Sequence, residues 1–107
     1  MIKHISMFSF KGDAGGKTKE ENINEVRQLL LDLPSQIPFI LTNEVGAQIK
    51  NTPETGADAP PVYDLVQIIT FETPENAAAY PAHPAHLDLV RRSDAMVEKM
   101  AMIDYEV

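Results

Sequence analysis

Two of the three histidines in this chain lie in one seven-residue stretch, Tyr80 to His86, which reads YPAHPAH. Proline is favoured at the first position of a helix, so Pro84 predicts a helix that begins there and has His86 in its first turn. The positive end of a helix disfavours an imidazolium ion, so we expect His86 to be neutral at pH 7. A neutral imidazole in this place could act as a general base.

Tyr80 precedes the two histidines and is separated from them by Pro81. Its phenol could donate a hydrogen bond to a carbonyl group or to a developing enolate, which makes His86 and Tyr80 the candidate catalytic residues. A structural interpretation is also open, in which His83 caps the helix and the other two side chains fill the space between helix and sheet. Spacing alone favours the structural interpretation.

A metal site at this corner is a further hypothesis, because His83 and His86 are three residues apart and could both reach one ion. The only carboxylate available close by in the sequence is that of Asp88. We therefore expect neither a bound metal nor a cofactor.

A glycine-rich stretch, Gly12 to Thr18, lies between a predicted strand and a predicted helix and ends in Gly-Lys-Thr, as a phosphate-binding loop does. The first glycine of such a loop belongs five residues before Gly16, where Lys11 stands instead. The loop is too short to wrap a phosphate, and we interpret it as a turn ahead of a capped helix.

The composition limits the partners and the location of the protein. The chain has 107 residues, enough for a single domain over residues 1–107. Its formal net charge of −7 opposes binding to nucleic acid and to anionic membrane surfaces. No cysteine is present, which excludes thiolate chemistry and is compatible with the cytoplasm, where we expect the protein. No apolar segment is long enough to span a membrane.

Apolar periodicity and capping residues predict the order strand, helix, strand, strand, helices, strand. The predicted strands cover residues 1–10, 39–49, 62–71 and 100–107, and the helices run from a cap at Thr18 to Pro34, from 75 to 80, and from Pro84 onward. Residues 50–61 are predicted to form a surface loop. This order is the split βαβ pattern of a ferredoxin-like α+β sandwich, βαββαβ.

Two details of the predicted helices can be tested against the structure. Thr18 and Glu21 have the spacing of a capping box at the start of the first helix. In the last helical region we expect five apolar side chains to face inward, which are Leu87, Val90, Met96, Val97 and Met100.

The strands carry large apolar side chains on both faces. In the first strand, Phe8 and Phe10 alternate with Ile5 and Met7. The predicted helices are enough to cover one face of a four-stranded sheet, so the other face needs a cover from outside the chain. A second copy packed sheet against sheet is the economical solution, and we expect a homodimer.

His4 lies on the same face of the first strand as Phe8 and Phe10. A histidine among apolar neighbours is most often a satisfied core residue. If this face lines a cavity, His4 adds a polar group to an aromatic-lined ligand site.

Segments spread over nearly the whole chain resemble the stress-responsive A/B barrel (Dabb) family. They are the start Met1-Ile2-Lys3-His4-Ile5, the strand from Tyr63 to Phe71, the corner His83-Pro84-Ala85-His86 and the ending Ile103-Asp104-Tyr105-Glu106-Val107. The resemblance implies a ferredoxin-like domain that dimerises into an α/β barrel. Most of the family has no assigned reaction, and one branch comprises cofactor-free polyketide cyclases that use aldol chemistry.

The resemblance also implies roles for single residues. In the cyclase pattern the second histidine of the corner is the base and the preceding tyrosine assists it, which places these roles on His86 and Tyr80. The histidine of the first strand corresponds to His4, whereas Leu65 stands where the cyclases have a further histidine. Taken with the strand pattern, the expected ligand-binding residues are His4, Phe8, Phe10, Leu65 and His83.

We therefore expect a small dimeric Dabb protein, without an assignable reaction, that binds a small hydrophobic or aromatic, polyketide-like ligand near Tyr80 and His86. The first alternative is a cofactor-free, cyclase-like enzyme with His86 as general base and Tyr80 as oxyanion donor. The second alternative is a small monooxygenase of the same fold superfamily that oxidises aromatic compounds.

Overall fold

The fold is known from a computed structural model that describes residues 1–49 and 62–107. The elements are β1 (Ile2–Phe10), α1 (Lys19–Asp32), the 3₁₀ turn η1 (Leu33–Ser35), β2 (Ile40–Ala47), β3 (Leu65–Phe71), α2 (Pro74–Ala79), α3 (Pro84–Ser93) and β4 (Val97–Glu106). The loop predicted at residues 50–61 lies outside the described residues.

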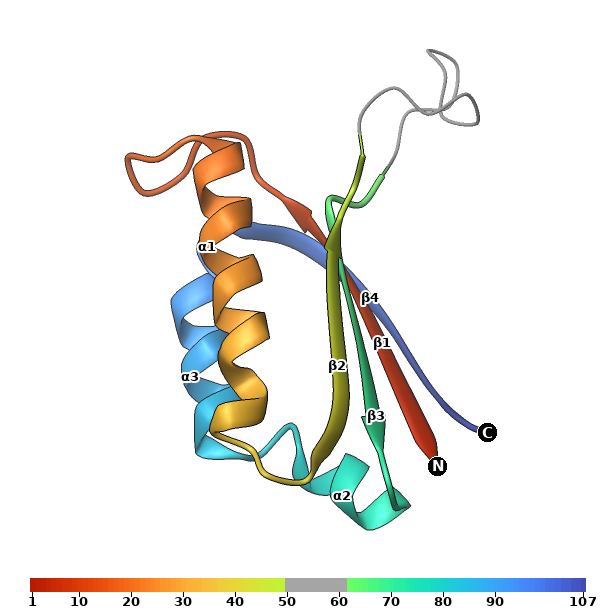
Figure 1. The fold of residues 1–107 in the computed structure, drawn as a ribbon. Coiled ribbons are helices and arrows are strands. Elements are labelled where there is room, and N and C mark those ends of the chain that lie inside the picture. Colours follow the sequence, from red (N-terminus) through yellow and green to blue (C-terminus); the bar gives the residue numbers. More distant parts are fainter. Residues whose placement is uncertain (50–61) are drawn as a thin grey trace.

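The four strands form one antiparallel sheet in the order β2-β3-β1-β4. The helices α1 and α3 lie together on one side of this sheet, and α2 lies at the end of the sheet where β3 stops (Figure 1). The architecture is a ferredoxin-like α+β fold, which confirms the βαββαβ prediction. β3 begins at Leu65, three residues later than predicted, and β4 begins at Val97, three residues earlier.

The predicted capping box is present at the start of α1. The hydroxyl of Thr18 accepts a hydrogen bond from the Glu21 backbone N–H at 3.2 Å, and the Glu21 carboxylate accepts one from the Thr18 N–H at 3.1 Å. These bonds use two of the N–H groups that a helix start leaves without partners. The hydrogen bond from the Thr18 backbone also lowers the pKa of Glu21.

The inward face of α3 differs from the prediction. Leu87 and Val90 were expected to face the core but are 56% and 44% exposed, whereas Leu89 and Ser93 are buried. The helix ends at Ser93, so Met96, Val97 and Met100 do not belong to it. Ser93 can be buried because its hydroxyl donates to the Leu89 carbonyl at 2.8 Å, four residues back, which satisfies the donor. The buried stripe of α3 therefore runs through Leu89 and Ser93, four residues apart, rather than through Leu87 and Val90.

The core lies between the helices and one face of the sheet. It consists of Phe8, Phe10, Val26, Leu30, Leu33, Ile37, Ile40, Leu65, Ile69, Phe71, Tyr80 and Leu89. Residues directly opposite each other on antiparallel strands share a face, so the register identifies the other face as well. On that helix-free face, Ile5 lies between Ile68 and Ile103. Ile103 is 57% exposed, which agrees with the prediction that one apolar face lacks a cover within the chain.

Candidate ligand site at the histidine cluster

Tyr80 is the centre of a group of side chains that comes from both ends of the chain. It follows α2, is 2% exposed, and its ring centre lies 4.6 Å from that of His86 and 5.6 Å from that of His4. The Phe71 ring lies 5.3 Å away on the core side. We call Tyr80, His4, His86 and Asp104 the histidine cluster. The structure therefore brings together three residues that the sequence singled out.

His86 has a defined tautomer. Its Nδ1 lies 3.0 Å from the carbonyl oxygen of Pro81, which can only accept, so Nδ1–H donates and Nε2 is left without a proton in the neutral ring. Desolvation lowers the pKa of His86, the Pro81 hydrogen bond opposes this in part, and the neighbouring His4 lowers the pKa further. The ring is therefore neutral at pH 7, as predicted, although desolvation is the largest cause.

His4 is held by a carboxylate from the opposite end of the chain. The pairing of β1 with β4 places Asp104 directly opposite His4, and the Asp104 carboxylate oxygen lies 2.6 Å from Nδ1. The carboxylate accepts the Nδ1 proton and so fixes the orientation of the imidazole. Sequence reasoning did not assign a role to Asp104, because the pair is 100 residues apart and depends on the register of the last strand.

The outer ring nitrogens of the two histidines can be reached from solvent, although His4 is only 9% exposed. In the described part of the chain, Asn22 Oδ1 is the single fully buried side-chain polar atom that lacks a hydrogen-bond partner. The hydrogen bonds of His4 and His86 within that part use Nδ1 only. Both Nε2 atoms must therefore be accessible, and each can accept a hydrogen bond from a bound molecule when its ring is neutral.

The Tyr80 hydroxyl belongs to a buried polar layer beneath the histidines. Burial raises the pKa of Tyr80, and a side-chain interaction with Gln67 opposes this in part. Gln67 Nε2 donates to Asn43 Oδ1 at 2.9 Å, and Asn43 Nδ2 donates to the Leu30 carbonyl at 2.9 Å. The phenol therefore remains protonated at neutral pH, and its position is linked to β3, β2 and α1.

His83 has the capping role that the structural interpretation gave it. Its Nδ1 accepts a hydrogen bond from the Ala85 backbone N–H at 3.1 Å, and its ring packs 6.0 Å from the ring of Phe39. His83 and His86 thus direct their Nδ1 atoms to different backbone groups. No group of three or more His, Cys, Asp or Glu side chains suited to a metal ion occurs among the described residues.

The remaining predicted ligand-binding residues fill the core. Phe8, Phe10 and Leu65 are between 2% and 4% exposed, so other side chains cover them in this structure. Leu65 is paired with Phe8 at the far end of β3 from Phe71. Of the five predicted ligand-binding residues, His4 packs its ring against that of Tyr80, and the His83 backbone N–H donates to the Tyr80 carbonyl at 3.1 Å.

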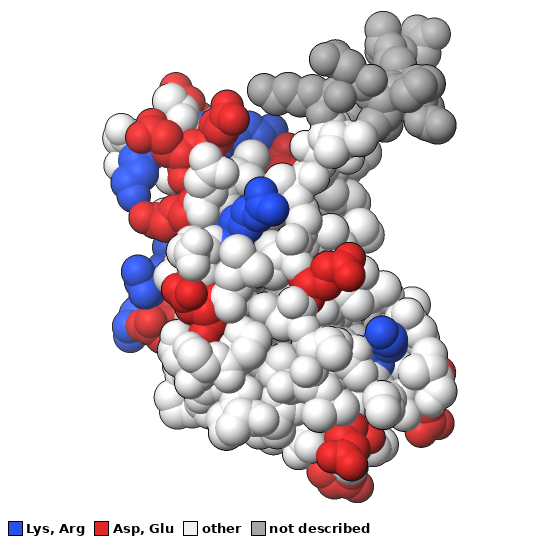
Figure 2. Space-filling view, in the orientation of Figure 1, with Lys and Arg blue, Asp and Glu red and all other residues white. Residues whose placement is uncertain are grey.

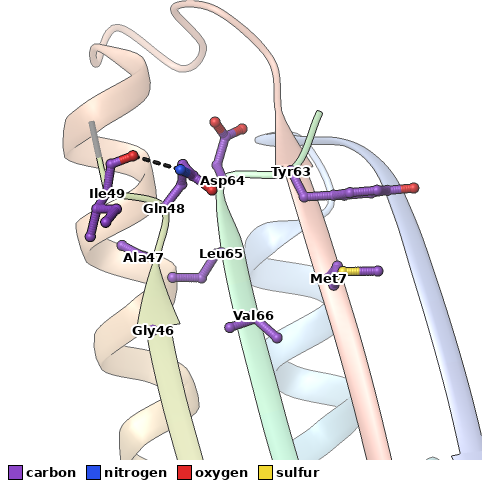
Figure 3. Close-up of a pocket in the computed structure, with 9 residues that line it drawn as sticks. All are labelled: Met7, Gly46, Ala47, Gln48, Ile49, Tyr63, Asp64, Leu65 and Val66. Carbon is purple, nitrogen blue, oxygen red and sulfur yellow. Dashed lines mark hydrogen bonds between the residues drawn. The ribbon is translucent and has the colours of Figure 1, made fainter. Parts of the chain in front are cut away.

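A separate hollow of about 300 Å³ lies at the end of the sheet where β3 begins (Figure 3). It is lined by Met7, Gly46, Ala47, Gln48, Ile49, Tyr63, Asp64, Leu65 and Val66. None of these residues belongs to the histidine cluster. Sequence reasoning did not identify this hollow, which depends on how three strand ends meet.

The glycine-rich loop before α1 closes on itself. Ala14 and Lys17 exchange two backbone hydrogen bonds of 3.0 and 3.1 Å around Gly15 and Gly16, which have φ angles of 63° and 77°. Such a turn needs positive φ at both central residues, which glycine adopts without strain. The Lys17 ammonium pairs with Glu25 at 2.7 Å. The backbone N–H groups of Ala14 and Lys17 are thus used within the turn and are not free to bind a phosphate.

Charged side chains of both signs are mixed over the outer surface of α1 and its neighbours (Figure 2). In the range covered by the structure, no helix is both long and apolar enough to cross a membrane.

The sequence profile of the stress responsive A/B barrel domain (Dabb) matches residues 2–107. The chain belongs to the Dabb family. No match was found among curated proteins. One solved structure that is similar over nearly the whole length is a dimeric protein of unknown function with a ferredoxin-like fold from Bacteroides fragilis. It is 24% identical with a TM-score of 0.80, over 99% of this chain and 95% of that one.

Two enzymes share the fold at lower identity. A hydroxynitrile lyase from Passiflora edulis is 16% identical with a TM-score of 0.76, over 99% of this chain and 92% of that one. An antibiotic biosynthesis monooxygenase is 18% identical with a TM-score of 0.69, over 100% of this chain and 98% of that one. At these identities the likeness concerns the fold, which thus accommodates different reactions.

Proposed function

We propose that this Dabb protein binds a small, mainly apolar ligand with a hydroxyl or carbonyl group at the histidine cluster. The main support is the pair of accessible Nε2 atoms on His4 and His86, whose Nδ1 atoms are held by Asp104 and Pro81. A neutral Nε2 accepts a hydrogen bond from a ligand hydroxyl. The aromatic rings around Tyr80 supply the apolar surroundings that are usual for a small-molecule site.

The net charge of −7 contributes to the choice of ligand, because it disfavours anionic molecules near the surface. A small phenol or an aryl ketone combines an apolar body with one polar group. Either kind of compound would place its oxygen beside His86 and its ring against the aromatic side chains around Tyr80.

The test is a titration with such compounds, followed through the imidazole NMR signals. We expect small phenols to shift the signals of His4 and His86, and His86→Gln to weaken binding. His83→Asn is a matched control, because asparagine is a good helix cap and removes a neighbouring imidazole. Unchanged affinity in His86→Gln, or shifts confined to the hollow around Tyr63, would refute this site.

A base-catalysed reaction at the same site is the second candidate function. It is supported by the lowered pKa of His86 and the raised pKa of Tyr80, which make one group a proton acceptor and the other a hydrogen-bond donor at pH 7. His86 would remove a proton from a carbon next to a carbonyl group, and the phenol of Tyr80 would stabilise the enolate oxygen.

This reaction can be tested without knowledge of the natural substrate. Exchange of the methyl protons of acetophenone into D₂O reports proton removal by the protein. A general base contributes about 10²- to 10⁴-fold, so His86→Gln should lower the protein-catalysed rate by that order. Exchange at the rate of free imidazole in both proteins would show that the site binds without catalysis.

We also propose that the protein is a homodimer in which the helix-free faces of two sheets pack together. The support is the row of apolar side chains on that face, including Ile5, Ile68 and Ile103, and the description of the Bacteroides fragilis relative as dimeric. Burial of this face would remove a continuous apolar surface from water. The histidine cluster lies on the opposite, helix-facing side and stays accessible in such a dimer.

A further inference from the structure

Two methionines on the edge strand β4 are unusually exposed for side chains that face the helices. Met100 and Met102 are 46% and 59% exposed and are separated by Ala101. Successive side chains of a strand point to opposite faces, so the two thioethers lie on the same face. Within residues 1–49 and 62–107, no helix covers this edge of the sheet sufficiently to bury them.

The strand register places these methionines beside the histidine cluster. Met102 is directly opposite Ser6 and Met100 is opposite Phe8, while the next pair along the same face is His4 with Asp104. Diagonal neighbours on one sheet face lie within reach of long side chains. A ligand that contacts the Nε2 atom of His4 from the solvent side therefore has the Met102 thioether next to it, and Met100 is the next side chain along the same face.

We propose that Met100 and Met102 form an oxidisable apolar border of the histidine cluster, and that peroxides weaken ligand binding by converting them to sulfoxides. In this step the O–O bond of hydrogen peroxide breaks, one oxygen bonds to the thioether sulfur and the other leaves as water. Sulfur loses two electrons and the peroxide gains them. The product is polar where the thioether was apolar.

The other methionines provide comparisons within the same chain. Met7 lies on the helix-free face of β1, and Met96 packs against the core; both are partly buried. Met1 is 59% exposed, but it is at the chain terminus, paired with Val107. If solvent accessibility sets the rate of oxidation, Met100 and Met102 should form sulfoxides several-fold faster than Met7 and Met96.

The first experiment measures oxidation rates in the full-length protein. Hydrogen peroxide is added, and the sulfoxide content of each methionine is followed by peptide mass spectrometry. We expect Met100 and Met102 to be oxidised several-fold faster than Met7 and Met96. Equal rates at all four positions would overturn the inference, and this result does not depend on the proposed ligand site.

The second experiment measures the effect on binding and rests on the proposed function. The uncharged phenol 1-naphthol is titrated before and after treatment with peroxide that is then removed, with the imidazole NMR signals as the readout. We expect oxidation to weaken the naphthol-induced shifts of His4 and His86 several-fold. The double variant Met100→Leu, Met102→Leu keeps the side-chain volume and should become insensitive to peroxide.

The outcomes separate the two claims. If 1-naphthol does not shift the histidine signals of the untreated protein, the ligand site itself is refuted, and so is the proposed effect of oxidation on binding there. If 1-naphthol shifts them and peroxide weakens binding equally in the native chain and the double leucine variant, the methionine border alone is refuted.

Discussion

At the scale of single residues, the chemistry of the cluster depends on which nitrogen of each imidazole carries the proton. The Pro81 carbonyl and the Asp104 carboxylate are both acceptors, so each selects the Nδ1–H form. Burial then lowers the pKa of His86 and raises the pKa of Tyr80. A proton acceptor and a protonated phenol thus lie with their rings 4.6 Å apart.

The lowered pKa of His86 makes a prediction about stability and pH. The unfolded chain takes up a proton on this residue near pH 6.5, whereas the folded chain does so only at lower pH. The unfolded state therefore binds more protons in that window, and the free energy of unfolding falls as the pH drops below about 6.5. In His86→Gln this contribution is absent.

Urea unfolding curves between pH 5 and pH 8 measure the effect. We expect the free energy of unfolding of His86→Gln to vary less between pH 7 and pH 5 than that of the native chain. Near pH 8 the ring is neutral in both states, so the two slopes should coincide there. A variant with the same pH dependence as the native chain would mean that His86 is not desolvated.

At the scale of the elements, α3 offers a test of which helix face packs on the sheet. Leu89→Ala removes a side chain that is 6% exposed and should lower the free energy of unfolding by about 2–5 kcal/mol. Leu87→Ala is the matched control, because it is the same substitution at a side chain that is 56% exposed. It should change the free energy of unfolding by less than about 0.5 kcal/mol. Thermal or urea unfolding of both variants gives the comparison. A larger loss of stability from Leu87→Ala than from Leu89→Ala would mean that the opposite face of α3 packs on the sheet.

Elements whose signals are local could be predicted from the sequence. The Thr18 and Glu21 capping box and the helix start at Pro84 both depend on residues within one turn, and both are present. The inward face of α3 could not be read from apolar spacing, because burial of Ser93 depends on its hydrogen bond to the Leu89 carbonyl. The start of β3 was misplaced because Val62 and Tyr63 are apolar but lie before the strand.

The candidate site was predictable only in part for the same reason. Tyr80 and His86 are close in the sequence, so their contact could be anticipated. The pairing of His4 with Asp104 requires the register of the first and last strands, and the hollow near Tyr63 requires three strand ends. Both features depend on tertiary packing.

At the scale of the whole molecule, the helix-free sheet face determines how the protein associates. Ile103 lies on this face, so Ile103→Asp would place a charge in the proposed contact between two sheets and should give a monomer. Leu87→Asp puts the same charge on the exposed face of α3 and should leave the dimer intact. Sedimentation at micromolar concentration measures both. A monomeric native chain, or a dimer in Ile103→Asp, would contradict the proposed interface.

The central claim is that the Nδ1 atoms of His4 and His86 donate to Asp104 and Pro81, which leaves the two Nε2 atoms for a ligand. Long-range ¹H–¹⁵N NMR spectra of the imidazoles, recorded at a pH where both rings are neutral, report the tautomer directly. We predict the Nδ1–H tautomer for both rings, with the His86 nitrogen signals moving when a small phenol is added. An Nε2–H tautomer at either residue, or a phenol complex that leaves these signals unchanged, would contradict the account.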